Sequence, residues 1–343
     1  MQDGSEPQDR DALIIKWTAE QRTLARRLIF KDHDLSFSVV RLLSDAVPDD
    51  GEDYDTPDVR VEDPSHIQVD GLRYVGGLDI SFVEDTGEGQ DADEKTGDSK
   101  HERDREGQES RSTKEPDAFA TVVVLEYPSL KVLHQITQPI HLTVPYIPSF
   151  LAYRELPAYL SLLTSLRAKL QEEDKSGDFP QVLLVDGNGR LHAREAGSAC
   201  AVGWEAGIPT FGVAKNYQPM HSWDHITPKD KTGTSGHWRD TQNGMRRIAQ
   251  EQLTKPGSWF GLFGNRTESD VVTKAAYIGA AVAPPGKAKN PIFVSTGHKI
   301  SLVTVIRLTL MLSRTRIPEP VRLADQISRQ AVRDMAKGRG KAG

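Results

Sequence analysis

Four short stretches of the chain each place one metal-binding or proton-handling side chain near the end of an apolar run. These side chains are Asp79 in VGGLDISF, Glu155 in PYIPSFLAYRE, Asp186 in VLLVDGNG and His298 in STGH. Carboxylates at strand ends, drawn from segments far apart in the chain, suit a site that gathers divalent cations on oxygen ligands. Such sites favour phosphodiester chemistry, because metal ions neutralise charge on both the attacking and the leaving oxygen.

Each of these side chains also has a plainer interpretation. Asp79 interrupts an apolar strand, where an unpaired buried carboxylate is costly, so the pattern favours a ligand over an edge-strand residue facing solvent. Asp186 opens Asp-Gly-Asn-Gly, which is also a turn sequence, but the apolar strand before it favours the ligand. Glu155 could be a solvated helical glutamate, and His298 could be an ordinary residue at a helix start.

Two further features could act on a phosphodiester strand. Lys215 ends the strand pattern FGVAK, where it could offset charge that develops on a phosphate, or could be a surface lysine. Pro145 and Pro148 fix φ on both sides of Tyr146 and Ile147. A stiff, exposed aromatic turn can wedge into a base stack, although a tyrosine that packs at a helix start is at least as common.

The composition indicates a chain with one sizeable core. Its 343 residues are 37% apolar and 27% charged, which is enough for one large domain. No apolar run approaches the ~18 residues of a membrane span, and the first residues lack a secretory signal pattern. The single cysteine, Cys200, excludes an internal disulfide and a cysteine-rich zinc site. We therefore expect a protein that is not secreted and works in the cytoplasm or nucleus.

The net charge of −6 averages over very different segments. Residues 84–117 hold thirteen acidic and six basic side chains, whereas residues 286–343 hold twelve Lys or Arg against three acids. The acidic stretch has almost no apolar residues and is expected to be a disordered insertion. The basic end fits a polyanion-binding face, although basic tails are often only solvated.

Apolar periodicity predicts helices and strands that alternate in the second half of the chain. The expected helices are residues 17–30, 148–170, 196–206 and 300–312, and the expected strands are 74–83, 119–127, 132–137, 181–185, 210–214, 274–282 and 292–295. Pro157 is expected to kink the second helix or to begin a new one. Residues 44–66 and 216–270 are expected to be loops, and 331–343 a basic disordered tail.

These elements predict a single α/β domain over residues 1–330 with long polar insertions. Three strands in an antiparallel meander, followed by alternating helices and strands, describe a mixed sheet with helices on both faces. A ribonuclease H-like sheet has this layout. In it, an acid in the first strand lies beside an acid that ends the fourth strand, and Asp79 and Asp186 occupy those places.

The blocks that carry these residues resemble the endonuclease V family of inosine-directed nucleases. The resemblance covers about residues 74–83, 119–215 and 272–330, and rests on six blocks in order: GGLDISF, PYIPSFLAYRELP, QVLLVDGNGRLHAREAG, GIPTFGVAK, STGHKISL and RIPEPVRLADQISR. It implies a ribonuclease H-like fold and Mg²⁺-dependent hydrolysis, with Mn²⁺ as a substitute. The cut would fall at the second phosphodiester 3′ to an inosine and leave 3′-hydroxyl and 5′-phosphate ends.

The resemblance also implies roles for single residues. The catalytic set would be Asp79, Glu155, Asp186 and His298, with the three carboxylates as metal ligands and Lys215 as the phosphate contact. The strand-separating wedge would be Pro145, Tyr146, Ile147 and Pro148, and the base pocket Leu151, Gly187, Gly197, Gly212 and Ala214. His192 and Arg194 would lie near the substrate backbone. Glycines suit such a pocket, since a flipped base read by backbone donors needs close approach.

The chain departs from the family pattern in ways that bear on its substrate. Ser149 stands where bacterial members usually have glycine, and the stretches 84–117 and 216–270 lie outside the shared core. Acidic, low-complexity insertions are typical of eukaryotic members, which prefer inosine-containing RNA. We therefore expect single-stranded RNA with inosine as the substrate, with deoxyinosine in DNA also cut, and a cytoplasmic or nucleolar location.

Three alternatives stay open on the sequence. One is a non-cleaving protein that binds inosine in RNA, which the presence of all four candidate catalytic residues argues against. Another is a DNA-repair nuclease acting mainly on deoxyinosine, because no sequence feature locates the contact to a 2′-hydroxyl that would separate RNA from DNA. The third is a different ribonuclease H-like nuclease, which the PYIP turn and the small-residue pocket disfavour.

Overall fold

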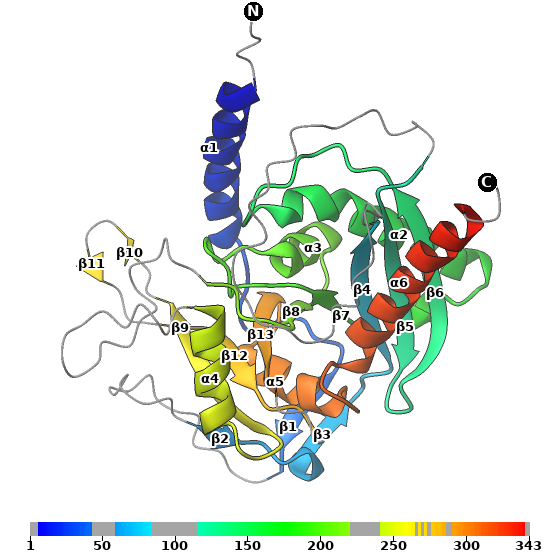
Figure 1. Ribbon diagram of the computed structural model, residues 1–343. Coiled ribbons are helices and arrows are strands. Elements are labelled where there is room, and N and C mark those ends of the chain that lie inside the picture. Colours follow the sequence, from blue (N-terminus) through cyan, green and yellow to red (C-terminus); the bar gives the residue numbers. More distant parts are fainter. Residues whose placement is uncertain are drawn as a thin grey trace, which may run out of the picture.

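A nine-stranded mixed sheet with helices on both faces forms the centre of the protein (Figure 1). The structure, a computed structural model, describes residues 6–42, 59–83, 115–219, 241–264, 267–268, 271–272, 276–285 and 290–339. The strands of the sheet, in spatial order, are β2 (Arg60–Val61), β9 (Ser258–Gly264), β12 (Ala276–Val282), β13 (Ile292–His298), β8 (Thr210–Ala214), β7 (Val182–Asp186), β4 (Tyr74–Phe82), β5 (Ala118–Glu126) and β6 (Lys131–Ile140).

Helices and two small ribbons complete the described chain. The α-helices are α1 (Glu6–Ala25), α2 (Leu151–Glu172), α3 (Ser198–Ala206), α4 (Gln242–Gln252), α5 (Leu302–Met311) and α6 (Glu319–Arg339). Two 3-10 turns lie at Pro64–His66 and Ser176–Asp178, and the ribbons pair β1 (Ser38–Arg41) with β3 (Ile67–Asp70) and β10 (Thr267–Glu268) with β11 (Val271–Val272). No helix within these ranges is both long and apolar enough to cross a bilayer.

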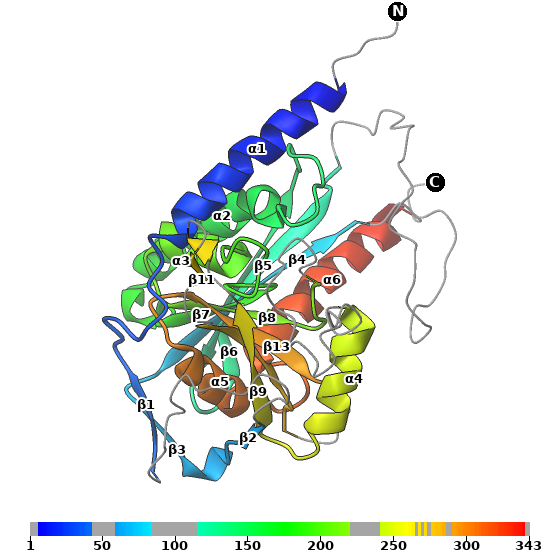
Figure 2. The same cartoon turned by 90° about the vertical axis from the view of Figure 1, so that its left-hand side faces the viewer.

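The pairing of the central strands confirms the predicted α/β sheet. Strands β4, β5 and β6 form an antiparallel meander, and β7 runs parallel to β4 on one side and to β8 on the other. The helix α6 lies across β4 and β5, and the helix α1 lies beside α2 and α3, away from the centre of the sheet (Figure 2). The expected layout of a meander followed by alternating helices and strands is therefore confirmed.

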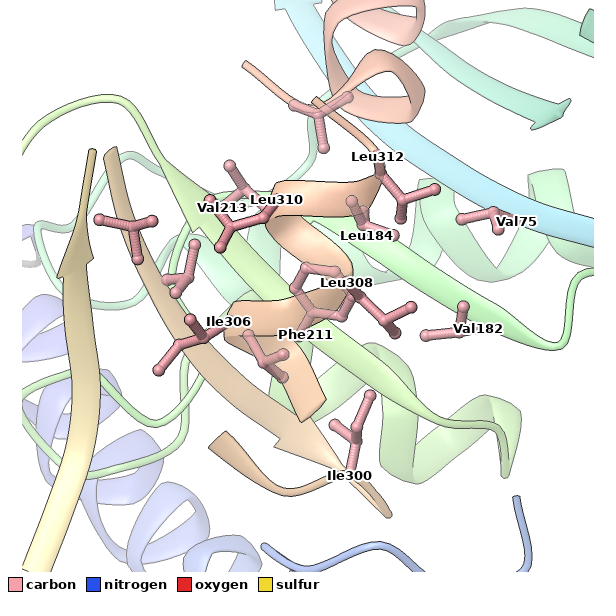
Figure 3. Packing of buried hydrophobic residues seen from close by; sticks show 14 of the residues in the cluster. Val75, Val182, Leu184, Phe211, Val213, Ile300, Ile306, Leu308, Leu310 and Leu312 are labelled. Carbon is pink, nitrogen blue, oxygen red and sulfur yellow. The ribbon is translucent and has the colours of Figure 1, made fainter. Parts of the chain in front are cut away.

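Side-chain alternation along β7 sorts the core into two layers. Val182 and Leu184 pack with residues of α5 and α6 on one face of the sheet (Figure 3), whereas Leu183 and Val185 pack with α2 and α3 on the other. Successive side chains of a strand point to opposite faces. Asp186 therefore shares the face of Val182 and Leu184, which is the α6 face.

Three of the predicted irregular segments are ordered in part, and the first of them, the expected loop 44–66, contains β2 and the 3-10 turn at Pro64–His66. The expected loop 216–270 contains α4 and β9, because Met245 and Ala249 give α4 a buried face and β9 reads SWFGLFG, an apolar strand interrupted by glycine. The expected tail from 331 continues α6 as far as Arg339. Residues 84–114, 220–240 and 340–343 of the predicted insertions and tail lie outside the described residues.

Two predicted helices also differ in detail. The helix α2 continues through Pro157, so the alternative of a second helix that begins there is wrong. Proline has no backbone N–H, so at this position, beyond the first turn, α2 lacks the hydrogen bond to the carbonyl of Tyr153. The first helix ends at Ala25, and the expected end at residue 30 was wrong. Neither change moves the strands that carry the candidate site residues.

A substitution of Gly77 on β4 tests whether α6 must lie as close to the sheet as the structure shows. A methyl group at Gly77 would lie 2.1 Å from the carbonyl oxygen of Pro320, at the start of α6. Backbone cannot yield as a side chain can, so we expect Gly77→Ala to destabilise the fold by more than about 2 kcal/mol in urea unfolding. Gly177→Ala is the control, because nothing lies within 4 Å of the added methyl group. Equal midpoints for the two variants would contradict the close approach.

Candidate metal centre and active site

Two strands and one helix bring three carboxylates together. In the parallel register Leu78 pairs with Val185, so Asp79 of β4 and Asp186 at the end of β7 are neighbours. Asp325 of α6 joins them, and one oxygen from each of the three side chains lies within 4.8 Å of the other two. The sequence predicted the pairing of Asp79 with Asp186, and the structure agrees with it.

The spacing and electrostatics of this cluster fit a hard divalent cation. A cation bound by oxygens at roughly 2.0–2.4 Å holds opposite ligand oxygens up to about 4.8 Å apart. Burial and the nearby Asp186 carboxylate raise the pKa of Asp79 to about 8, with a smaller effect from Asp325. A cation would relieve the repulsion between these carboxylates, so a divalent cation suits both the geometry and the charge of the cluster.

Lys215 lies inside the cluster at the end of β8. Its Nζ is 2.7 Å from Asp186 Oδ2 and 2.6 Å from Asp325 Oδ1. Burial alone lowers the pKa of Lys215, but the two carboxylates outweigh it and raise the pKa overall. The structure thus makes Lys215 the ion partner of two candidate ligands, and its predicted contact with a phosphate stays a prediction.

Glu155 approaches the cluster from the other side of the sheet. It belongs to α2, where Ser198 Oγ donates a hydrogen bond to its Oε2 at 3.0 Å. Burial raises the pKa of Glu155 to about 7, and Asp186 is close enough to add to that shift. Among the described residues, Glu155 is not one of the three clustered carboxylates. It can therefore act beside the cluster through a proton or a bridging water more readily than as a fourth direct ligand.

His298 does not join the cluster, so its prediction as a catalytic residue is corrected. Strand β13 runs antiparallel to β8, and His298 pairs with Thr210 at the start of β8, whereas Asp186 pairs with Val213 near its end. Three strand residues separate those positions by roughly 10 Å. The His298 ring accepts a hydrogen bond from the Ile29 backbone N–H at 3.3 Å and meets the edge of Trp204, which is a structural role.

Asp325 is the candidate ligand that sequence reasoning missed. It stands in RIPEPVRLADQISR, a block used for the family resemblance without a role for its acid. The sequence pattern that could have indicated this ligand is an acid on an amphipathic helix close to apolar residues. Ala324, the preceding residue, is buried, and Ile327, two residues further on, is half-buried. An acid next to the buried face of a helix needs a partner, as Asp79 does in its strand.

The predicted wedge divides into an exposed part and a buried part. Tyr146 is 55% exposed, and the prolines on both sides are exposed too. Ile147 is buried against Trp17 of α1 and Phe150. The assignment of Ile147 to an exposed wedge is therefore wrong: this side chain anchors the turn, and Tyr146 alone presents a large apolar surface.

His192 and Arg194 hold the wedge turn from behind. His192 Nε2 lies 2.9 Å from the Ser149 carbonyl oxygen, and Arg194 Nη2 donates to the same oxygen at 2.6 Å. Arg194 also stacks 4.0 Å above the Phe150 ring and donates to Gln21 of α1. Both side chains bind the protein's own backbone, and their place near the substrate backbone stays a prediction. Ser149 itself has a φ of +64°, a left-handed conformation that explains why glycine suits this position.

The predicted base pocket surrounds the turn after Asp186. A methyl group at Gly197 would lie 2.3 Å from the Asn188 carbonyl oxygen, and one at Gly212 would lie 2.5 Å from the Gly187 carbonyl oxygen. Gly187 has a φ of +135° and open space beside its Cα. Two glycines thus support the turn at close range and the third borders free space. Ala214 is buried and Leu151, the first residue of α2, is half-buried.

Substitutions of Asp325 and of His298 should affect Mn²⁺ affinity differently. Asp325→Asn removes one anionic oxygen ligand, so we expect Mn²⁺ affinity to fall by roughly tenfold or more. His298→Asn should leave Mn²⁺ affinity within about twofold, because its ring lies at the other end of β8. Isothermal titration with Mn²⁺ measures both, and Asp334→Asn on the exposed face of α6 is the matched control. Weakened binding in His298→Asn alone would reverse the assignment.

Comparison with known sequences identifies relatives over most of the chain. The family model of endonuclease V matches residues 107–326, more than half of the chain. Human endonuclease V is 34% identical over 263 residues, which cover 77% of this chain and 73% of that protein. Endonuclease V of Thermofilum pendens is 36% identical over 210 residues, covering 60% of this chain and 68% of that protein.

Solved structures give the same answer for the fold. The catalytic domain of human endonuclease V matches with a TM-score of 0.63 and 29% identity, covering 95% of this chain and 98% of that one. Ciona intestinalis endonuclease V, in complex with a 23mer DNA containing an inosine followed by a ribo-adenosine, matches with a TM-score of 0.61 and 27% identity, covering 95% and 99%. With its clustered carboxylates on this shared sheet, the chain belongs to the endonuclease V family of nucleases.

Proposed function

We propose that this protein is a metal-dependent endonuclease that recognises inosine in single-stranded RNA and also cuts DNA at deoxyinosine. It would cleave the second phosphodiester 3′ to the inosine and leave 3′-hydroxyl and 5′-phosphate ends. The observation that carries the proposal is the cluster of Asp79, Asp186 and Asp325 beside an exposed Tyr146 turn, in a chain of the endonuclease V family. The inosine and ribo-adenosine in the Ciona intestinalis complex support the choice of substrate.

Asp79, Asp186 and Asp325 would hold the cation, with Mg²⁺ as the natural ion and Mn²⁺ as a substitute. When bound there, the cation would supply positive charge that offsets the negative charge of the phosphodiester and its leaving oxygen. Lys215 bonds Asp186 and Asp325 and can turn toward a phosphate oxygen from the same place. Glu155, whose pKa burial raises to about 7, is suited to accept or return a proton near neutral pH.

The turn that follows Asp186 would bind and recognise the base. The open space at Gly187 lets a base approach the backbone N–H and C=O groups of the turn. The close contacts of Gly197 and Gly212 hold that turn rigid. A hypoxanthine that leaves the stack can be read on its edge by such fixed backbone groups. Tyr146 would fill the gap that the base leaves in the strand.

The test is a side-by-side digestion of matched single-stranded RNA and DNA, each with one central inosine. We expect Mg²⁺-dependent cleavage of both, faster on RNA, with the cut mapped at the second phosphodiester and none on the guanosine control. Asp79→Ala should abolish cleavage and keep binding of the inosine RNA, because it removes a ligand and no part of the strand path. Asp70→Ala, at an exposed carboxylate of β3, is the matched control.

Each alternative gives a distinct result in that digestion. Binding of inosine RNA without product under Mg²⁺ or Mn²⁺ would mean a non-cleaving binding protein. Cleavage confined to deoxyinosine in DNA would mean a repair nuclease. Equal cleavage with and without inosine, or full activity of Asp79→Ala, would contradict the proposed site and mechanism.

Tyr146 should matter most where the inosine is paired. Loss of an aromatic stacking surface costs ~1–3 kcal/mol per base, so Tyr146→Ala should slow cleavage of inosine within an RNA stem by about tenfold or more. Cleavage of the same inosine in an unpaired strand should fall less, by under about threefold, since there is no stack to separate. Tyr146→Phe keeps the ring and should behave as wild type. An equal loss on paired and unpaired substrates would rule out a wedge.

A further inference from the structure

Two serine hydroxyls hold the Asp79 carboxylate, and the proposed reaction uses neither of them. Ser328 of α6 donates a hydrogen bond to Asp79 Oδ2. Ser81 Oγ lies 3.3 Å from the same oxygen, and the two serine oxygens are 2.7 Å apart. Ser328 is fully buried. The three side chains therefore form a closed triangle between β4 and α6.

The number of protons fixes the direction of these hydrogen bonds. A hydroxyl carries one proton, so Ser328 can donate to only one of its three neighbours: Asp79, Ser81 and the Asp325 backbone carbonyl oxygen 3.0 Å away. A carboxylate is a stronger acceptor than a hydroxyl, so the Ser328 proton goes to Asp79. Ser81 then donates to the Ser328 oxygen at 2.7 Å, which is nearer than Asp79 Oδ2 at 3.3 Å. The result is a chain from Ser81 through Ser328 to Asp79, in which each bond polarises the next.

We propose that Ser328 is a positioning residue that orients the Asp79 carboxylate and thereby sets the affinity for the cation, with Ser81 acting through it. This inference rests on the metal-dependent part of the proposed function. Both serine contacts fall on Oδ2, so they orient the whole carboxylate and leave Oδ1 without a serine contact. Hydrogen bonds from outer residues to a ligand fix its orientation and typically change metal affinity or activity by roughly 10–100-fold.

The same helix that supplies one ligand thus orients another. Asp325 and Ser328 are three residues apart on α6 and lie on neighbouring turns of the same side. Asp325 contributes its oxygen to the cluster directly, and Ser328 contributes through Asp79. The close approach of Pro320 to Gly77 seats this end of α6 on β4. The affinity for the cation therefore depends on how α6 packs against β4.

The test is Mn²⁺ binding by Ser328→Ala in the absence of nucleic acid, measured by isothermal titration. We expect the Kd for Mn²⁺ to rise by about tenfold or more. In cleavage assays, the Mn²⁺ concentration for half-maximal rate should rise by the same factor, and the rate at saturating Mn²⁺ should stay within about threefold of wild type. That split distinguishes a positioning role from a general loss of folded protein.

Three further variants sharpen the comparison. Ser313→Ala is the matched control, because Ser313 is also buried and its hydroxyl donates to the Thr309 carbonyl oxygen at 2.6 Å. It should lose stability and keep the Mn²⁺ affinity of wild type. Ser81→Ala should weaken Mn²⁺ binding by less than Ser328→Ala. The loss in the double variant should be smaller than the sum of the two single losses, because Ser81 acts mainly through Ser328.

Unchanged Mn²⁺ affinity in folded Ser328→Ala, or an equal loss in Ser313→Ala, would overturn the inference. If Ser328→Ala does not fold, Ser81→Ala decides it: weaker Mn²⁺ binding supports the chain of hydroxyls, and wild-type binding overturns it. Since Mn²⁺ is titrated without nucleic acid, a wild-type protein that binds Mn²⁺ and leaves inosine RNA intact would refute the proposed function and spare this inference.

Discussion

The candidate site depends on the docking of one helix across one strand. The helix α6 can lie against β4 because Gly77 has no side chain where the backbone of Pro320 passes. In this position α6 places Asp325 next to the carboxylates of β4 and β7 and buries Ser328 against Asp79. Any larger residue at position 77 would lift the start of α6 and with it both of these contacts.

Crowded carboxylates are the second constraint, because they repel each other at this distance. Several features of the chain offset that repulsion. Lys215 pairs with two of the three carboxylates, and Arg329 pairs with Asp325 at 3.0 Å. Burial and Asp186 raise the pKa of Asp79 to about 8, which strengthens proton binding at this carboxylate. A cation competes with protons for this carboxylate, so metal binding and proton release are coupled.

The wedge turn depends on an element that lies outside the sheet. Trp17 of α1 stacks on Tyr153 with ring centroids 4.5 Å apart, and Gln21 donates to the Ala196 carbonyl oxygen at 3.1 Å. Arg194 connects Gln21 to Ser149, so α1, the turn before α3 and the wedge turn form one hydrogen-bonded unit. These contacts hold the backbone beneath the exposed Tyr146 in place, as a side chain that separates stacked nucleobases requires.

The sequence by itself determined the sheet, the adjacency of Asp79 and Asp186, and the presence of Lys215 at the site. Those features follow from local apolar periodicity and from the order of strands, both of which are written in short segments. Only the tertiary structure decided that Asp325 joins the carboxylates and His298 does not, and that Ile147 and Arg194 hold the wedge turn from inside. These outcomes depend on the direction of β13 relative to β8 and on how α6 and α1 dock. Apolar periodicity can mark an acid beside a buried helix face, as at Asp325, but it does not say which strand that face meets.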